Sequence, residues 1–215
     1  MTKPALRLHA LLRRLAADRD GVSMVEFALC LPLFVGAALM GIETVNLAYA
    51  NQKIGDIATL TADNISRIRI GISEGDVTES LNGLKTLGGT LQFPANGRII
   101  VSSVQPVLDS SNNVTNQKIR WQRCTGALNV TSSYGLQGEQ VGVTGMGPTG
   151  RKIATAANTE LIFVEVAYTY RPIISNTLLG ARTLHAIVAM NVRERSSNDL
   201  TNSGTASDCA TFSAT

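Results

Sequence analysis

The chain has 215 residues, of which 16% are charged and 5% aromatic, a size that suits one folded domain with an additional segment. Its formal net charge of +3 comes from residues 1–21, which hold five basic and two acidic side chains and leave fourteen of each sign in the remainder. A nucleic-acid-binding protein needs a basic face on its folded part, so the charge pattern predicts no nucleic-acid partner.

Residues 22–50 are the most apolar part of the sequence, and residues 27–42 contain no charged side chain. These sixteen residues would span about 24 Å as a helix, and the hydrocarbon core of a bilayer is about 30 Å thick. Glu26 and Glu43 are therefore expected near the two edges of the membrane. Basic residues precede the run, which predicts a cytoplasmic basic leader at 1–21 and an outer domain beyond a transmembrane segment at 22–50.

This apolar segment allows more than one interpretation. It could be a plain uncleaved anchor, or a secretory signal peptide cut after Ala50, because residues 48–50 (Ala-Tyr-Ala) form a small-x-small site after a polar stretch. The Arg13-Arg14 pair weakly indicates a folded-export signal, although no matching polar-aromatic context follows it.

A further interpretation rests on Gly21 and Glu26, because a carboxylate five residues after a glycine stands at the mouth of an apolar helix. A half-buried carboxylate is costly without a partner. Cleavage after Gly21 would create a free amine, which would be a suitable partner for Glu26, especially when it belongs to a neighbouring subunit. Within the same helix, Ala37 and Gly41 form a small-xxx-small pair that lets helices approach closely, and Pro32 removes one backbone donor. Small residues and proline are also common in membrane helices that have no such role.

An ordered series of features starts at the glycine that precedes the apolar run. It consists of a glycine, a few small or apolar residues, a Glu-Phe-Ala-Leu motif, a Leu-Pro step, and then a glycine and an acidic residue. The residues concerned are Gly21, Glu26-Phe27-Ala28-Leu29, Leu31-Pro32, Gly41 and Glu43. In these features the segment resembles the TadE/TadG-like pseudopilins of tight-adherence pili.

The resemblance implies a bacterial inner-membrane protein with one span, a cytoplasmic N-terminus and a periplasmic domain. A prepilin peptidase would cut after Gly21 and leave Val22 as the new N-terminus, and Glu26 and Phe27 would act in assembly with other pilin or pseudopilin subunits. The implied function is that of a minor pilin-like subunit of a type IV-like pilus, which contributes to pilus assembly and surface adhesion. No small-molecule substrate is implied.

Beyond the membrane segment, apolar residues at three-to-four spacing continue through residues 51–70, so one helix is expected from about 22 to 69. A second, short helix is predicted at 73–87, with Ser73 as its cap and Asp76 three residues later. The Gly-Gly pair after residue 87 is expected to end it.

Four strands are predicted from runs of branched residues, at 98–108, 118–123, 161–170 and 184–192. In the third strand, apolar residues alternate with Glu165 and Thr169, which predicts one buried face. Glycine-rich residues 132–150 indicate a long surface loop, and residues 173–180 one helical turn. Residues 71–215 are predicted to form an α+β domain, and the overall fold class is α+β, with the long N-terminal pilin-like helix packed on a small antiparallel sheet.

The three cysteines differ in their settings. Cys30 lies in the apolar run, where a thiol is a small hydrophobe. Cys124 and Cys209 lie in the polar remainder, and in an exported domain they are the pair available for a disulfide. Two free buried thiols are the alternative.

No pattern of residues indicates catalysis, a metal or a cofactor. His9 belongs to the leader, and His185 lies on a predicted strand, where a structural role is expected. Residues 145–150 match Gly-x-Gly-x-x-Gly, but Pro148 and loop-like flanks argue against a nucleotide site. We therefore expect no enzymatic activity. The alternative function is a secreted or membrane-anchored binding module without a pilus role.

Overall fold

The computed structural model describes residues 13–14, 21–174, 180–195 and 197–214, without the side chains at 84–87 and 90. The predicted leader therefore lies outside the described residues apart from positions 13, 14 and 21, and so does most of the helical turn predicted at 173–180. The chain forms two compact units, Met1–Val45 and Asn46–Thr215. The helix α2 (Val22–Ser66) begins in the first unit and ends in the second.

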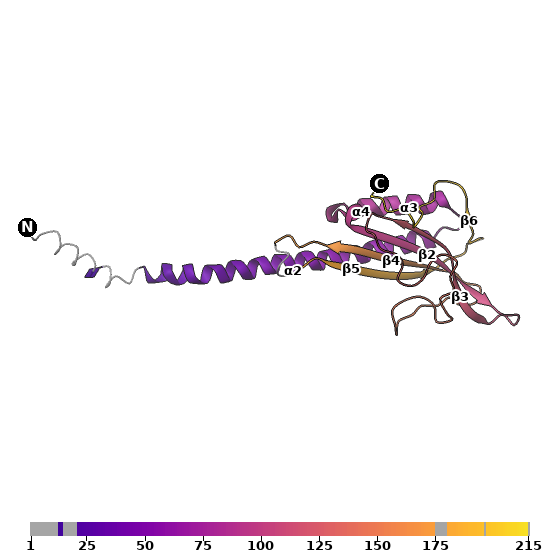
Figure 1. Cartoon of the computed structure of the whole chain (residues 1–215), viewed down its shortest axis with the longest axis horizontal. Helices are drawn as coiled ribbons and strands as arrows, with labels where there is room; N and C mark the ends of the chain where they lie inside the picture. The colour runs from indigo at the N-terminus through magenta and orange to yellow at the C-terminus, as the bar shows by residue number, and fades with distance from the viewer. Residues whose placement is uncertain (1–12, 15–20, 175–179, 196, 215) are drawn as a thin grey trace, which may run out of the picture. The chain divides into compact units, whose positions relative to one another are not determined.

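The folded unit contains an antiparallel four-stranded sheet with the strand order β3-β2-β4-β5 (Figure 1). Its strands are β2 (Gly97–Leu108), β3 (Val114–Thr125), β4 (Leu161–Tyr170) and β5 (Arg182–Asn191). The four predicted strands and the α+β class are confirmed. A parallel pair between β1 (Ile72–Ser73) and β6 (Leu200–Thr201) was not predicted.

The short helices between α2 and the sheet follow local sequence signals. In α3 (Glu74–Leu87) the Ser73 hydroxyl accepts a hydrogen bond from the Asp76 backbone N–H at 3.2 Å, and an Asp76 carboxylate oxygen accepts one from the Ser73 N–H at 2.9 Å. This reciprocal cap is the one predicted. The 3₁₀ turn η1 (Gly89–Leu91) and α4 (Phe93–Asn96) then lead into β2.

The main core lies between α2 and one face of the sheet, which we call the helix side. Ala50, Ile54, Ile57 and Ile65 recur at helical spacing on α2 and are at most 1% exposed. They share one apolar cluster with side chains of α3 and of all four strands, including Trp121, Val164 and Tyr168. The predicted helix continuation beyond residue 50 is thus explained by burial.

The helix α2 ends three residues before the predicted position, and the carbonyl of its last residue, Ser66, accepts a hydrogen bond from the Arg193 N–H at 3.1 Å. The Arg195 guanidinium donates to the backbone oxygens of Ile65 and Ile68. A cation that binds the carbonyls at a helix C-terminus satisfies acceptors that have no intrahelical partner.

The opposite face of the sheet, the loop side, is also covered. Strand β4 was predicted to have one buried face, and this is wrong, because nine of its ten residues are buried, Glu165 included. The long connection at 126–160 supplies the cover, with Tyr134 meeting Phe163 edge-on at 5.5 Å between ring centroids and Met146 buried in the same cluster. The glycine-rich segment is therefore a loop, as predicted, but one that closes a second core.

Candidate functional site

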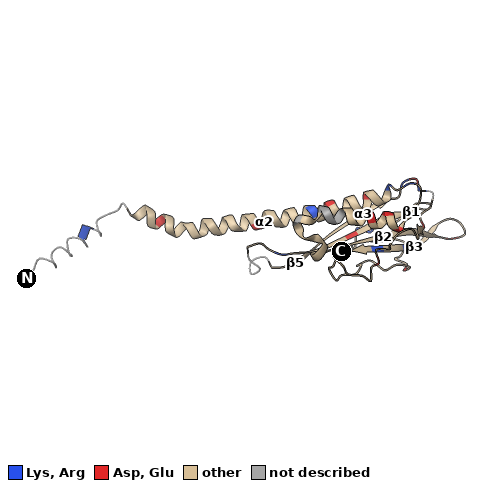
Figure 2. Ribbon diagram, turned by 90° about the horizontal axis from the view of Figure 1, so that it is seen from above, with Lys and Arg blue, Asp and Glu red and all other residues tan. Residues whose placement is uncertain are grey.

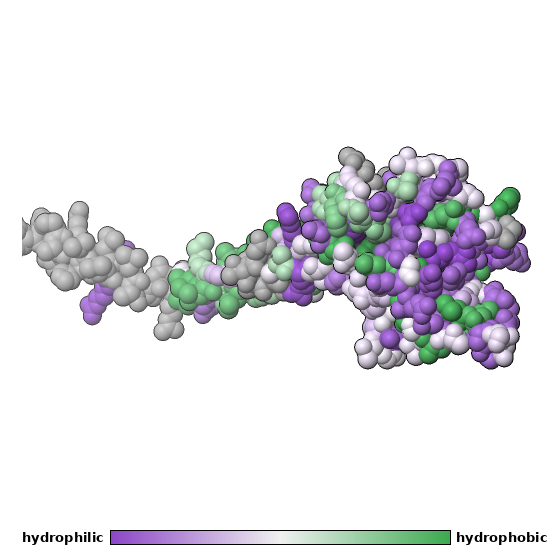
Figure 3. Space-filling model, turned by 45° about the vertical axis from the view of Figure 1, so that its right-hand side comes forward, coloured by the Kyte–Doolittle hydropathy of each residue, from purple (hydrophilic) through white to green (hydrophobic). Residues whose placement is uncertain are grey.

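The N-terminal half of α2 is an exposed apolar helix. Every residue from 22 to 42 is exposed, and Glu26 is the charged residue among them. Figure 2 shows this half of α2 almost free of charge, and Figure 3 shows apolar atoms gathered on it. Among the described residues, α2 is the helix that is long and apolar enough to cross a membrane, and it lies near the N-terminus. Such a helix is compatible with a single-pass membrane anchor.

The predicted processing and assembly residues lie on the first turns of α2. Gly21 immediately precedes the helix, and its carbonyl accepts a hydrogen bond from the Val25 N–H at 3.2 Å. Val22 is the first helical residue, and Glu26 and Phe27 are exposed one turn later. Because positions four apart share a helix face, Val22 and Glu26 stand one above the other, about 6 Å apart along the axis.

The predicted packing residues lie further along the same helix. Pro32 is inside α2, and the helix continues through it. Ala37 and Gly41 share one face at the spacing of four residues. Apart from its chain neighbours and the adjacent backbone of α2, no described atom lies within 4 Å of the position that a Gly41 Cβ would take, so this face is open to another helix.

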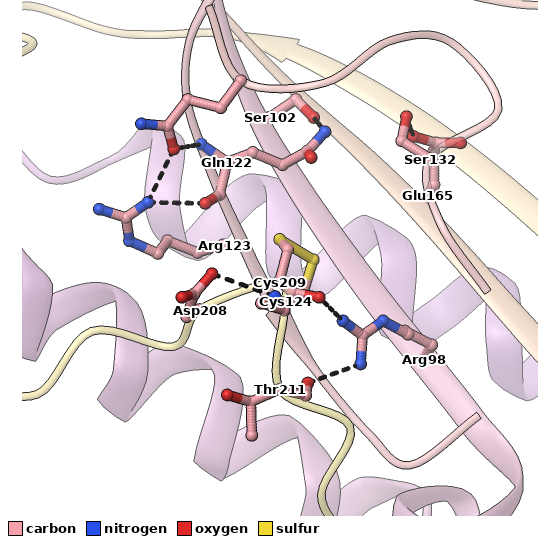
Figure 4. The surroundings of a disulfide bond; sticks show 12 residues. Arg98, Ser102, Gln122, Arg123, Cys124, Ser132, Glu165, Asp208, Cys209 and Thr211 are labelled. Carbon is pink, nitrogen blue, oxygen red and sulfur yellow. Dashed lines mark hydrogen bonds between the residues drawn. A yellow bond between two sulfur atoms is a disulfide. The ribbon is translucent and has the colours of Figure 1, made fainter. Parts of the chain in front are cut away.

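In the folded unit, the predicted cysteine pair closes a disulfide, Cys124–Cys209, across 85 residues (Figure 4). Cys124 is near the end of β3, and its N–H donates to the Ser207 carbonyl at 2.8 Å. The bond therefore fixes the C-terminal segment to the edge of the sheet. Cys30 is a free, exposed thiol on α2.

Arg98 holds the same segment from the sheet. Its side chain is among the largest that are fully buried, and its guanidinium donates to the carbonyls of Gly126 at 2.9 Å, Thr211 at 3.0 Å and Cys209 at 2.6 Å. Phe212 lies over the guanidinium at 4.0 Å from the ring centroid. Burial lowers the pKa of Arg98. Sequence reasoning missed this residue, although an arginine at the start of an apolar strand is an available signal.

Three glutamates of the folded unit are buried, and two of them pair with arginine. Glu74 forms a bidentate ion pair with Arg123, and Glu160 lies 3.4 Å from the Arg120 Nε. The third, Glu165, is 8% exposed, and one of its oxygens accepts a hydrogen bond from the Ser132 hydroxyl (Figure 4). The other oxygen accepts a hydrogen bond from the Ser133 N–H at 3.0 Å.

Glu165 borders a pocket of about 710 Å³ on the loop side, which sequence reasoning did not predict. His185 lies at this pocket and is exposed on the edge strand β5. No described group of three or more histidine, cysteine, aspartate or glutamate side chains is arranged to hold a metal ion.

Comparison with known proteins places one similarity on this chain. Residues 21–63 match the family described as TadE-like protein. No curated protein and no solved structure matches the chain significantly. The matched range starts at Gly21, contains the whole exposed apolar half of α2 and ends three residues before the helix does. Residues 21–63 are thus similar to the TadE-like proteins.

Proposed function

We propose that the chain is a minor pilin-like subunit of a tight-adherence type IV-like pilus. A prepilin peptidase cleaves it after Gly21, and the apolar half of α2 then holds it in the bacterial inner membrane. Its N-terminus faces the cytoplasm and its folded unit the periplasm, from which it joins other pilin or pseudopilin subunits and contributes to pilus assembly and adhesion. Its role is structural rather than enzymatic.

The main support for the proposal is that α2 is one continuous helix, with an exposed first half and a later part that is buried in the core of the folded unit. Residues 22–42 are exposed and, apart from Ser23 and Glu26, apolar, whereas Ala50 and Ile54 of the same helix are fully buried in the core. Cleavage after Ala50 would cut this helix and remove Leu47, which packs against that core. The continuous helix therefore favours an anchor that is retained over a signal peptide that is removed.

Glu26 has a specific role in this proposal. After cleavage, the Val22 amine would stand at the N-terminus of an apolar helix, where it needs a counter-charge. Glu26 of a neighbouring subunit supplies it, which sets the register between subunits. The spacing of four residues also places Glu26 one turn from the amine of its own chain. Before assembly, Glu26 thus neutralises the amine of its own chain, and on assembly it exchanges this contact for one with the amine of a neighbouring subunit.

The first test is the N-terminal residue and intact mass of the protein purified from its native membrane. Val22 as the first residue supports the proposal. Asn51 would mean an ordinary secreted protein and would remove it, while an intact Met1 would leave an anchored domain without prepilin processing.

A variant pair tests the role of Glu26. Glu26→Ala should leave cleavage intact and reduce the number of pili, because the amine loses its counter-charge on the neighbour. Glu79→Ala, which removes an exposed glutamate of α3, is the matched control and should leave pili unchanged. Normal pili on cells with Glu26→Ala would refute the assigned role.

A second candidate function is an anchored binding module without a pilus role. The pocket at Glu165 favours this function, because a pocket of about 710 Å³ has the size that is typical of small-molecule sites. Deletion of the gene separates the candidates, since loss of pili supports the first and normal pili the second.

A further inference from the structure

The pocket on the loop side combines an apolar floor with one buried acid. Ile100, Ala167 and Ile187 belong to three adjacent strands, β2, β4 and β5, and line it together with Glu165. The segment at 129–134 forms a wall and adds Tyr134. Its volume of about 710 Å³ lies within the range of about 300–1,000 Å³ that is usual for ligand pockets.

Glu165 differs from the other buried glutamates of the folded unit, because it has no ion-pair partner in the described part of the chain. Glu74 and Glu160 are equally buried, and each has an arginine. A buried carboxylate without a cation is costly, and proteins normally pair it. Glu165 therefore lacks an arginine partner of the kind that Glu74 and Glu160 have in the described part of the chain.

Hydrogen bonds to Glu165 leave room for such a partner. A carboxylate accepts about four hydrogen bonds, and Ser132 and Ser133 supply one to each oxygen. Both bonds favour the ionised form and oppose the effect of burial, which raises the pKa of Glu165. The remaining acceptor positions are available to a donor that enters the pocket.

We propose that this pocket binds a primary ammonium group carried on a short aliphatic chain, with Glu165 as its counter-ion. The ammonium donates to the free acceptor positions of the carboxylate, and the chain lies on Ile100, Ala167 and Ile187. An anion would be repelled by Glu165. A metal ion would need further acidic or imidazole ligands, and no described group of three surrounds such a position. The ligand is either a free amine or the lysine side chain of a partner protein.

The proposal does not depend on the pilus role and is tested on the full chain in detergent micelles with labelled isoleucine methyl groups. Ile100 and Ile187 report from the pocket, and Ile57 reports from the helix-side core. Titration with n-butylamine should shift the two pocket signals to saturation and leave that of Ile57 unchanged. The neutral analogue n-butanol should bind at least tenfold more weakly.

Variants identify the counter-ion. Glu165→Gln should weaken n-butylamine binding at least tenfold, whereas Glu139→Gln, which changes an exposed loop acid outside the pocket, should leave it unchanged. If Glu165→Gln fails to fold, Ala167→Leu keeps the acid, fills the floor and should abolish the shifts. Equal binding of amine and alcohol, wild-type affinity in Glu165→Gln, or no saturable shift with n-butylamine would overturn the proposal.

A blocked Gly-Lys-Gly peptide separates the two sources of the ammonium group. Binding at least as tight as that of n-butylamine supports a lysine of a partner protein. Binding of n-butylamine without the peptide supports a free amine.

Discussion

The Cys124–Cys209 disulfide should be a major contributor to the stability of the folded unit. Removing it by Cys124→Ala with Cys209→Ala, or by reduction, frees a loop of 85 residues in the unfolded chain. The folded segment stays attached through other contacts, among them the hydrogen bonds from Arg98 to the Cys209 and Thr211 carbonyls. The main effect is therefore expected in the unfolded state, which gains conformational freedom.

The chain-entropy relation for a loop of this length gives a loss of about 4–5 kcal/mol in the free energy of unfolding at 25 °C. For a folded unit of this size, about 4 kcal/mol corresponds to a fall of about 8–16 °C in melting temperature. The loss would be smaller if the C-terminal segment detached, because the folded state would then gain freedom as well.

Denaturant titration of the full chain in micelles, oxidised and reduced, measures this difference. Cys30→Ala is the matched control, because it removes a free, exposed thiol and should shift the midpoint little. The reduced wild type and the double variant should agree with each other. A loss below about 1 kcal/mol in both would refute the reasoning that the cross-link acts on the unfolded chain.

Three further changes test other parts of the fold by thermal or denaturant unfolding. Arg98→Met keeps the volume but leaves three carbonyls without their donor, and should cost about 3 kcal/mol. Gly145→Ala should lower the free energy of unfolding by about 3 kcal/mol, because φ is +79° and the added Cβ would lie 1.9 Å from the Ile153 oxygen. Its control, Gly142→Ala, has a similar φ of +83° but an open surrounding, and should lower it by about 1 kcal/mol. Burial raises the pKa of Glu165 above its ordinary value of 4.5, so the folded state favours the protonated carboxyl. This preference stabilises the folded state fully below about pH 4.5, and the stabilisation is lost as the pH rises through the raised pKa. The melting temperature of Glu165→Gln relative to wild type should therefore rise between pH 4 and pH 7, and a constant difference would contradict this assignment.

Local signals explain why most elements could be predicted from the sequence. The strand at 161–170 has the predicted ends, since its apolar run is bounded by residues that break the pattern. The cap of α3 involves two side chains three residues apart, so it is visible in one short window. The motif residues that are matched in the N-terminal segment also follow one another in one stretch of the sequence. A sequence pattern can predict such features because all interacting groups lie in one stretch.

Features built from distant segments could not be predicted in this way. The alternation in β4 does not tell whether its outer face meets water or a loop, and residues 126–160 have no period that marks them as a cover. The pairing of β1 with β6 joins two residues to two others more than 120 positions away. Strand β3 begins four residues earlier than predicted because Val114 and the polar residues Asn116 and Gln117 pair with β2 across the hairpin. Pairing with β2, rather than the apolar character of its own residues, therefore sets where β3 begins.

Arg98 and Glu165 show where a sequence signal exists but remains incomplete. Each is the one charged residue of its strand, and such a residue predicts a special environment because burial of an unpaired charge is costly. The sequence does not name the partners, since Arg98 bonds to carbonyls 28, 111 and 113 residues away, and backbone carbonyls carry no sequence signature. Glu165 receives its hydrogen bonds from a loop 32 and 33 residues earlier. The Arg98 guanidinium has three carbonyl partners, although its buried Nε has no hydrogen-bond partner in the described part of the chain. Glu165 has hydrogen-bond donors and no described cation. The three fixed acceptors mark Arg98 as a structural charge, whereas the missing cation marks Glu165 as a candidate ligand site.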